Sequence, residues 1–290
     1  MENKKAQAPA AKSSGLTRVL TAAVALPILI ASILIPWLWW LFVTLAAAAM
    51  LLGLWEFHLL AKRRDLNADR GVMYLAATAL FMVFFFTLPG QMIDVLMIQL
   101  ILIAFVISSL TVATLRGAPF DKLLASTGAT ILGVLYVVFL GGHLVALRVG
   151  FAQPLSAHLL SFFFLVLMGA DAGAYYTGRA LGKHKLAPKI SPGKTWEGVF
   201  GGIAAALAMA TLAHFWFFRE LPLKWGLSLA AVMTLLGILG DLTESALKRG
   251  SGAKDAANIL PGHGGILDRL DSLLFNAPLI YYFARLYFSS

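Results

Sequence analysis

Long runs of apolar residues without a charge constrain this chain more than any other feature of its sequence. Uncharged runs of about 17 to 25 residues are long enough for a helix to cross the hydrocarbon core of a bilayer. Nine such runs occur, at about 19–35, 37–60, 72–89, 92–114, 123–147, 157–181, 197–218, 224–247 and 270–288. We therefore expect an all-α, polytopic integral membrane protein with about nine transmembrane helices.

The overall composition agrees with this expectation and narrows the possible chemistry. Hydrophobic residues make up 60% of the chain and charged residues 13%, whereas soluble proteins carry about 25% charged residues. The chain has no cysteine, which excludes disulfides, thiolate metal sites and thiol nucleophiles. A bound metal would have to rest on carboxylate, imidazole or phosphate oxygen, and such ligands favour hard cations.

The positive charges predict the orientation of the chain. Its formal net charge is +9, but in so apolar a chain basic residues more often set topology or meet phosphate groups than bind nucleic acid, so we expect no nucleic-acid partner. All Lys and Arg residues except Arg148, Arg219, Lys224 and Arg285 fall before the first run or in alternate breaks between runs. The positive-inside rule then places the N-terminus in the cytoplasm and the C-terminus outside.

The first apolar run could instead belong to a secretory signal peptide. Against this alternative, no small-x-small cleavage site with a polar mature start follows the run, and the chain turns at Pro36 into another apolar run. We expect a disordered tail at 1–15, transmembrane helices that act as scaffold and lipid contact at 16–150, and a catalytic transmembrane region at 151–290. The catalytic region would carry cytoplasmic loops at 182–197 and 249–268.

Ionisable side chains are scattered in the first half of the chain. Glu56 lies one to two turns before Lys62 and Arg63, so an interfacial ion pair or a helix-end position is favoured over a catalytic role. Acids gather in the second half, at or near the predicted cytoplasmic ends of helices. These acids are Asp171, Glu197, Asp241, Glu244, Asp255, Asp268 and Asp271.

One helix face in the second half carries several of these polar groups. Asp241, Ser245 and Lys248 recur at i, i+4 and i+7, which places them on one face, with Glu244 beside them. A carboxylate at this depth costs roughly 2.5 to 3.5 kcal/mol on insertion scales and is usually retained because it pairs with a cation or a substrate. The structural alternative is a salt bridge from Asp241 to Lys248 or Arg249.

A glycine-rich basic loop follows this helix and leads to two more acids. Glycines let backbone N–H groups approach anionic oxygens, and Lys248, Arg249, Lys254 and Arg269 supply charged donors around them. Asp268 and Asp271, at i and i+3, could meet Asp241 across a narrow gap. Carboxylates from two helices would then hold Mg²⁺ together with substrate phosphates. Asp268 is also a plausible helix cap.

The preceding loop adds Ser191-Pro-Gly-Lys194-Thr-Trp-Glu197. A phosphate-binding P-loop is excluded, because Pro188 stands where its first glycine is required and no strand is expected before it. We expect residues 191–197 to cap the following helix while Lys194 reaches the same basic region; a loop that only sets topology is the alternative. Asp171, inside an apolar run, is expected to be functional.

These segments resemble a known family. Ser245-Ala-Leu-Lys-Arg249, Lys254-Asp255 and Pro261-Gly-His-Gly-Gly-Ile-Leu-Asp-Arg-Leu-Asp271 resemble the signature of the phosphatidate cytidylyltransferases, also called CDP-diacylglycerol synthases. The segments Asp171-Ala-Gly-Ala-Tyr-Tyr176 and 191–198 are similar to that family as well. The resemblance covers roughly residues 165–275, and no site residue is carried over from the first half of the chain.

The resemblance implies a reaction in which CTP and phosphatidate give CDP-diacylglycerol and diphosphate with Mg²⁺, the first committed step of phospholipid synthesis from phosphatidate. We expect the active site to face the cytoplasm from the inner membrane, because its residues lie near the predicted cytoplasmic ends of helices. A lipid phosphate is already anionic at neutral pH, so positioning and charge neutralisation would carry the reaction. Membrane lipid would be a further partner.

The resemblance also suggests roles for individual residues. Asp241 and Asp271, with Asp268, would hold the metal, and Asp241, Asp271 and Lys248 would be catalytic. Substrate phosphates would meet Ser245, Arg249, Lys254, His263, Arg269, Lys194 and Ser191, with Asp171, Glu197, Asp255 and Glu244 in supporting positions. Ser245 would bond a phosphate or a metal-bound water, and His263 would donate to diphosphate or order its loop.

Two other classes of function stay open from the residues alone. A transporter or channel for an anionic solute would need polar residues along a path through both leaflets. An enzyme that uses CDP-lipids or polyprenyl phosphates would carry other clustered-aspartate motifs. The sequence also leaves open a second, monovalent cation, a homodimer, and the groups that select cytosine and acyl chains.

Overall fold

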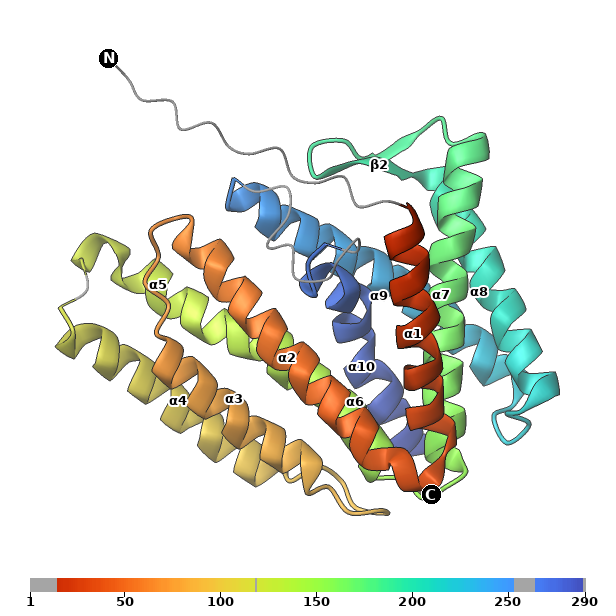
Figure 1. Cartoon of the computed structure of the whole chain (residues 1–290), viewed down its shortest axis with the longest axis horizontal. Helices are drawn as coiled ribbons and strands as arrows, with labels where there is room; N and C mark the ends of the chain where they lie inside the picture. Colours follow the sequence, from red (N-terminus) through yellow and green to blue (C-terminus); the bar gives the residue numbers. More distant parts are fainter. Residues whose placement is uncertain (1–14, 118, 253–263, 289–290) are drawn as a thin grey trace.

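The computed structural model describes residues 15–117, 119–252 and 264–288, and nearly all of them are helical (Figure 1). The first half consists of α1 (Gly15–Leu34), the 3-10 turn η1 (Pro36–Leu38), α2 (Trp39–Lys62), α3 (Arg70–Phe85), α4 (Val95–Leu115), α5 (Phe120–Gly133), the π-helical segment η2 (Val134–Phe139) and α6 (Leu140–Val149). The second half consists of α7 (Leu155–Leu181), the strands β1 (Lys185–Ala187) and β2 (Ser191–Thr195), α8 (Trp196–Trp216), α9 (Leu223–Gly250) and α10 (Leu267–Phe288). The predicted all-α class is confirmed, and the tail predicted as disordered lies almost entirely outside the described residues.

Helices cover all nine predicted apolar runs, but fewer of them have the character of a membrane span. Among the described helices, six are long and apolar enough to cross a membrane: Pro36–Lys62, Val95–Leu115, Phe120–Val149, Leu155–Leu181, Trp196–Trp216 and Leu223–Gly250. The segments Ala23–Leu34 and Arg70–Phe85 are shorter apolar helices. The membrane class of the protein is therefore supported, whereas nine spans and the orientation stay predictions.

Local sequence signals explain where several helices begin. Asp69 accepts a hydrogen bond from the Val72 N–H at 2.9 Å and caps α3, and Asp94 caps α4 through Met97 N–H at 2.9 Å. Both carboxylates satisfy N–H groups that have no partner within the helix. Gly90 adopts a φ of 83° in the turn between these helices, a conformation that favours glycine.

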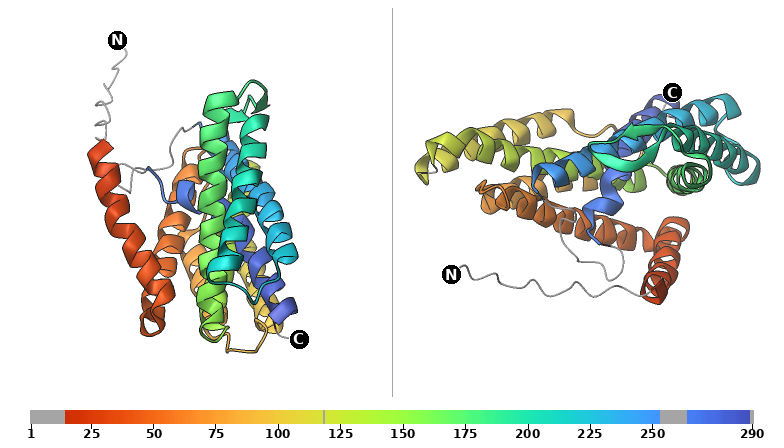
Figure 2. Two further views of the ribbon diagram at one scale, coloured as in Figure 1. Left: turned by 90° about the vertical axis from the view of Figure 1, so that its right-hand side faces the viewer. Right: turned by 90° about the horizontal axis from the view of Figure 1, so that it is seen from above.

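Small residues bring α7 and α8 into close contact. A Cβ atom on Gly173 would lie 2.4 Å from Ala205 Cβ, and one on Gly201 would lie 2.2 Å from Thr177 Oγ1. At the other side of this pair α9 packs against α8, and α10 lies between α9 and α6 (Figure 1). Helix α1 stands at the edge of the bundle, where it contacts α2 and α7 (Figure 2).

A short β-hairpin connects α7 to α8, and the sequence analysis did not anticipate it. Strands β1 and β2 are antiparallel, with Lys185 opposite Thr195 and Ala187 opposite Ser191. Thr195 fills the space left by Gly178 of α7 and by Gly182, which follows α7, and its hydroxyl accepts from the Gly198 N–H at 3.2 Å to cap α8. The predicted helix cap is therefore confirmed, while the expectation of no strand before Gly193 was wrong because tertiary packing against α7 stabilises one.

Candidate functional site

A cavity of ≈ 560 Å³, lined by charged as well as apolar residues, lies beside the hairpin. Its walls come from α7, from the hairpin with α8, from α9 and from the first turns of α10. Predicted site residues that line it are Asp171, Ser191, Lys194, Asp241, Asp268, Arg269 and Asp271. The structure thus brings together side chains that are separated by up to a hundred positions in the sequence.

Close packing of α9 on α10 places Asp241 near Asp271. Gly240 faces the backbone of α10 so tightly that a Cβ atom there would lie 2.3 Å from the Asp271 carbonyl oxygen. Asp241 follows directly in the sequence, and both acids face the cavity. The Asp271 carboxylate also accepts from the N–H of Ser272 at 2.6 Å. The predicted convergence of acids from these two helices is therefore present.

This packing leads to a stability prediction. Gly240→Ala should lower the free energy of unfolding by about 1–3 kcal/mol, because α9 and α10 must separate to admit the methyl group. Gly250→Ala is the matched control: nothing lies within 4 Å of a Cβ at that position, and alanine is favoured over glycine in a helix by roughly 0.5–1 kcal/mol. Thermal unfolding in detergent measures both changes, and equal melting temperatures for the two variants would contradict the prediction.

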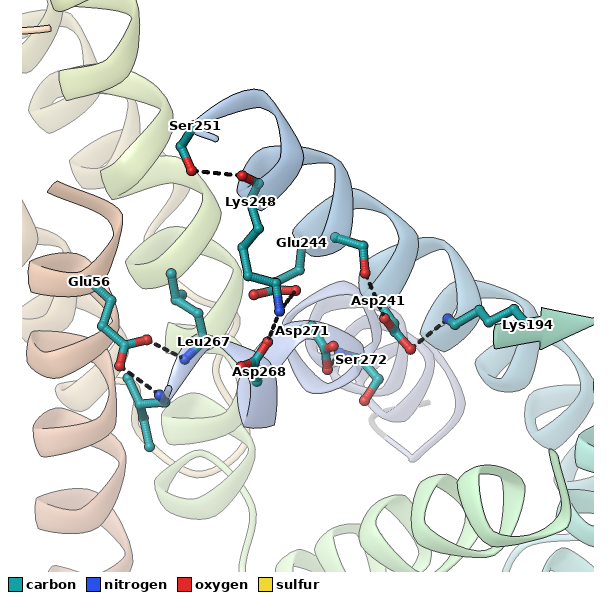
Figure 3. Close-up of polar contacts among 12 residues, drawn as sticks. Glu56, Lys194, Asp241, Glu244, Lys248, Ser251, Leu267, Asp268, Asp271 and Ser272 are labelled. Atoms are coloured by element: carbon teal, nitrogen blue, oxygen red, sulfur yellow. Dashed lines mark hydrogen bonds and ion pairs between the residues drawn. The ribbon is translucent and has the colours of Figure 1, made fainter. Parts of the chain in front are cut away.

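The hairpin delivers a cation to the cavity. Lys194 Nζ lies 2.6 Å from Asp241 Oδ2, and Ser245 Oγ donates to Asp241 Oδ1 at 3.3 Å (Figure 3). Lys194 therefore reaches the region of the acids, as predicted. In the described part of the chain Asp241 makes its ion pair with Lys194 rather than with Lys248 or Arg249, the two partners proposed in the structural alternative.

A second charged group fastens α9 to α10 beside the cavity. Lys248 Nζ lies 2.9 Å from Glu244 Oε2 and also pairs with Asp268 (Figure 3). Glu244 is almost fully buried, so its charge depends on Lys248 for compensation. Removing one partner of a buried ion pair leaves an uncompensated charge. Lys248 and Glu244 do not line the cavity, whereas Asp268 does.

The remaining predicted site residues do not line the cavity or lie outside the described residues. Glu197, in the first turn of α8, lies 2.6 Å from His184 Nδ1 and accepts from the His184 N–H at 3.2 Å, so it closes the base of the hairpin. Arg249 is exposed near the end of α9. Lys254, Asp255 and His263 lie outside the described residues.

Glu56 of α2 is a site-supporting residue that the sequence analysis did not identify. It is 0% exposed, and its carboxylate accepts from the backbone N–H groups of Ile266 at 2.8 Å and Leu267 at 2.9 Å (Figure 3). A buried acid of the first half therefore caps α10, the helix that carries Asp268 and Asp271. The expectation of an interfacial ion pair or a helix-end position was wrong, because Glu56 is buried and bonds to a distant helix.

Arg179 is a second residue that was assigned only to topology. It lines the cavity from α7 and donates to the Tyr175 hydroxyl at 3.1 Å. The position of Arg179 near the end of an apolar run indicated a cytoplasmic positive charge, but it did not indicate that the side chain faces the cavity. Together with Lys194 and Arg269 it gives the cavity cations from three separate elements.

The cavity has the donors that a hard cation requires. Carboxylates Asp171, Asp241 and Asp271 face it from three helices. Over residues 15–117, 119–252 and 264–288, no three His, Asp or Glu side chains are grouped closely enough to form a metal site by themselves. Protein sites for Mg²⁺ commonly supply one or two carboxylates and leave the other positions to phosphates and water. A pair of these carboxylates fits that pattern.

Comparison with known proteins identifies the family that the sequence motifs resemble. The cytidylyltransferase family profile matches residues 16–287. The chain is 37% identical over 268 residues to the phosphatidate cytidylyltransferase of Pseudomonas aeruginosa, covering 90% of this chain and 94% of that protein. It is 47% identical over 129 residues to that of Haemophilus influenzae and 49% identical over 123 residues to that of Bacillus subtilis, and these matches span 45% and 46% of the two relatives. The chain belongs to the cytidylyltransferase family.

Proposed function

We propose that this protein forms CDP-diacylglycerol and diphosphate from CTP and phosphatidate at the cytoplasmic surface of the inner membrane. The observation that carries the proposal is one cavity in which acids and cations from α7, the hairpin, α9 and α10 meet at the end of apolar helices. The similar proteins named phosphatidate cytidylyltransferase support the same substrates. The distribution of Lys and Arg supports a cytoplasmic position for this end of the bundle.

In the proposed reaction an oxygen of the phosphatidate phosphate attacks the α-phosphorus of CTP. The new P–O bond forms as the bond between the α-phosphorus and the bridging oxygen breaks, and diphosphate leaves with that oxygen. The nucleophile is already an anion, so the chain does not need a base to activate it. Its task is to align the two substrates and to offset the negative charge of their phosphates.

Several charged groups in and beside the cavity have roles in this scheme. Lys194, Arg179 and Arg269 would bind phosphate oxygens, since guanidinium and ammonium groups form strong charge-assisted hydrogen bonds to them. Asp241 and Asp271 would hold Mg²⁺, which supplies charge neutralisation when bound. Lys248 would not contact the substrates; through its ion pair with Asp268 it would fix the position of α10 against α9.

The position of the cavity suits two substrates of different solubility. Polar residues of the site gather at one end of the bundle, where a soluble nucleotide and a lipid headgroup can both arrive. A transport function would require polar groups along the length of the helices. The clustering of these groups at one end therefore favours transfer chemistry over transport.

The reaction is tested with the full chain in detergent, labelled CTP and phosphatidate. We expect CDP-lipid to form in the presence of Mg²⁺, to stop after EDTA treatment and to return when Mg²⁺ is added back, because carboxylates and phosphates otherwise repel each other at the site. Product is measured by thin-layer chromatography. Absence of CDP-lipid under all these conditions would reject the proposed function. An undiminished rate in EDTA would reject the proposed requirement for Mg²⁺.

A further inference from the structure

A second polar cavity, of ≈ 670 Å³, lies in the first half of the chain. It is lined by the end of α2, the start of α3, the end of α4 and the start of α5, and it shares no lining residue with the candidate active site. The distribution of Lys and Arg predicts that these helix ends and the hairpin lie on the same, cytoplasmic side of the membrane. The cavity is therefore predicted on the same side of the membrane as the candidate active site, but in a separate place.

The charges that line this second cavity suit an anion. Lys62, Arg70 and Arg116 line it, and Asp69 is the acid in its wall. Asp69 is already engaged, because it pairs with Arg116 and caps α3. Lys62 and Arg70 have no acidic partner in the part of the chain that the structure describes. Two cationic side chains thus remain available to a ligand.

Buried hydroxyl groups in the same walls lack partners. Ser109 of α4 is 2% exposed and Thr127 of α5 is 5% exposed, and among the described residues neither hydroxyl has a hydrogen-bond partner. Buried polar groups are nearly always hydrogen-bonded, and leaving one unpaired is unfavourable. A bound phosphate would give both hydroxyls an acceptor, since phosphate oxygens accept several hydrogen bonds.

Two other hydroxyl groups of α5, those of Ser126 and Thr130, have hydrogen-bond partners within the protein. Ser126 Oγ accepts from the Asn67 N–H at 3.1 Å, and Thr130 Oγ1 accepts from the Asp69 N–H at 3.0 Å. These two residues fasten the segment before α3 to α5 and so shape the cavity wall. Thr127 and Ser109 face the same cavity without such a partner.

Exposed apolar side chains are close in sequence to residues that line the cavity. Leu115 at the end of α4 is 79% exposed, and Phe120 and Leu124, one turn apart on α5, are each 85% exposed. Both helices belong to segments apolar enough to span a membrane. A phosphate site next to exposed apolar side chains suits a molecule with a charged head and hydrocarbon tails better than a free ion.

We propose that the cavity between α2, α3, α4 and α5 binds the phosphate group of an anionic membrane lipid, whose acyl chains cover Leu115, Phe120 and Leu124. Lys62 and Arg70 provide the charge, and Ser109 and Thr127 donate hydrogen bonds. The site does not rest on the proposed reaction. It gives the first half of the chain a lipid-binding site of defined chemistry in addition to its role as scaffold.

The test compares lipid binding by the full chain, by two variants of the site and by one control variant, using native mass spectrometry in mild detergent. Phosphatidylglycerol is the probe, phosphatidylcholine is the zwitterionic reference, and inorganic phosphate represents the free ion. We expect the double variant Lys62→Gln/Arg70→Gln to weaken phosphatidylglycerol binding by about tenfold for each positive charge that it removes. Thr127→Val should weaken it by about tenfold as well, and should raise the melting temperature of the lipid-free protein because an unpaired buried hydroxyl is removed.

The double variant Lys122→Gln/Lys189→Gln is the matched control. Like the test variant, it removes two positive charges from the predicted cytoplasmic side, but neither Lys122 nor Lys189 lines a described cavity. We expect it to bind phosphatidylglycerol as the unmodified chain does. Equally weakened binding in both double variants, or equal affinity for phosphatidylcholine, would overturn the site. Binding of inorganic phosphate as tight as that of phosphatidylglycerol would overturn the lipid as its ligand.

Discussion

Asp271→Asn is expected to lower the rate of CDP-lipid formation by about 10²–10³-fold, the effect typical of removing one preorganised electrostatic group. Asparagine keeps the size of the side chain but not its charge, so it would hold a divalent cation poorly. Asp271 lies where α9 and α10 pack tightly, next to Gly240. The substitution therefore tests the charge at the junction of the two helices and leaves their packing intact.

Product formation from labelled CTP, measured over a range of Mg²⁺ concentrations, gives the size of this effect. Asp94→Asn is the matched control, because Asp94 caps α4 through Met97 N–H and asparagine caps a helix about as well as aspartate. We expect this control to be as active as the unmodified protein. A rate for Asp271→Asn within a few-fold of the control would show that the Asp271 carboxylate is not needed.

Glu56→Ala is expected to destabilise the protein strongly and to reduce its activity. The substitution leaves the N–H groups of Ile266 and Leu267 buried without a partner, and each such group costs about 1–3 kcal/mol. It also releases the start of α10, on which Asp268 and Asp271 depend for their positions. Melting temperature in detergent and the rate of CDP-lipid formation are measured together.

Two further variants separate the role of the cap from the removal of any acid. Glu56→Gln keeps one oxygen that can accept from α10, so it should recover much of the stability and activity that alanine loses. Glu220→Ala removes a half-exposed acid whose partner is His158, and exposed ion pairs contribute at most about 1 kcal/mol. If Glu56→Ala melted at the same temperature as Glu220→Ala, the cap would not stabilise α10.

Much of the helical architecture can be predicted from the sequence, because uncharged apolar runs and their breaks are local signals. The breaks at Pro36 and at 89–90 separate helices as expected. The hairpin was missed because its strands are stabilised by contacts with α7, in particular the space that Gly178 and Gly182 leave for Thr195. Short strands of this kind have no periodic pattern of their own.

The candidate site could likewise be predicted only in part from the sequence. The spacing of Asp241, Ser245 and Lys248 places them on one side of α9, and the glycine-rich segment beyond indicates phosphate chemistry. Spacing along one helix does not say which of these groups faces a cavity and which faces a neighbouring helix. The structure places Asp241 in the cavity and Lys248 in a buried ion pair with Glu244 and Asp268.

The sequence by itself determined that this chain is a helical membrane protein, and its motifs indicated the family and the acids that belong to the site. Tertiary structure alone decided that Glu56 of α2 caps α10, that Gly240 brings Asp241 to Asp271, and that Lys194 reaches them from a hairpin. The physical reason is one of range. Apolar periodicity and helix caps act over a few residues, whereas a buried carboxylate or a closely packed glycine is defined by atoms of another helix.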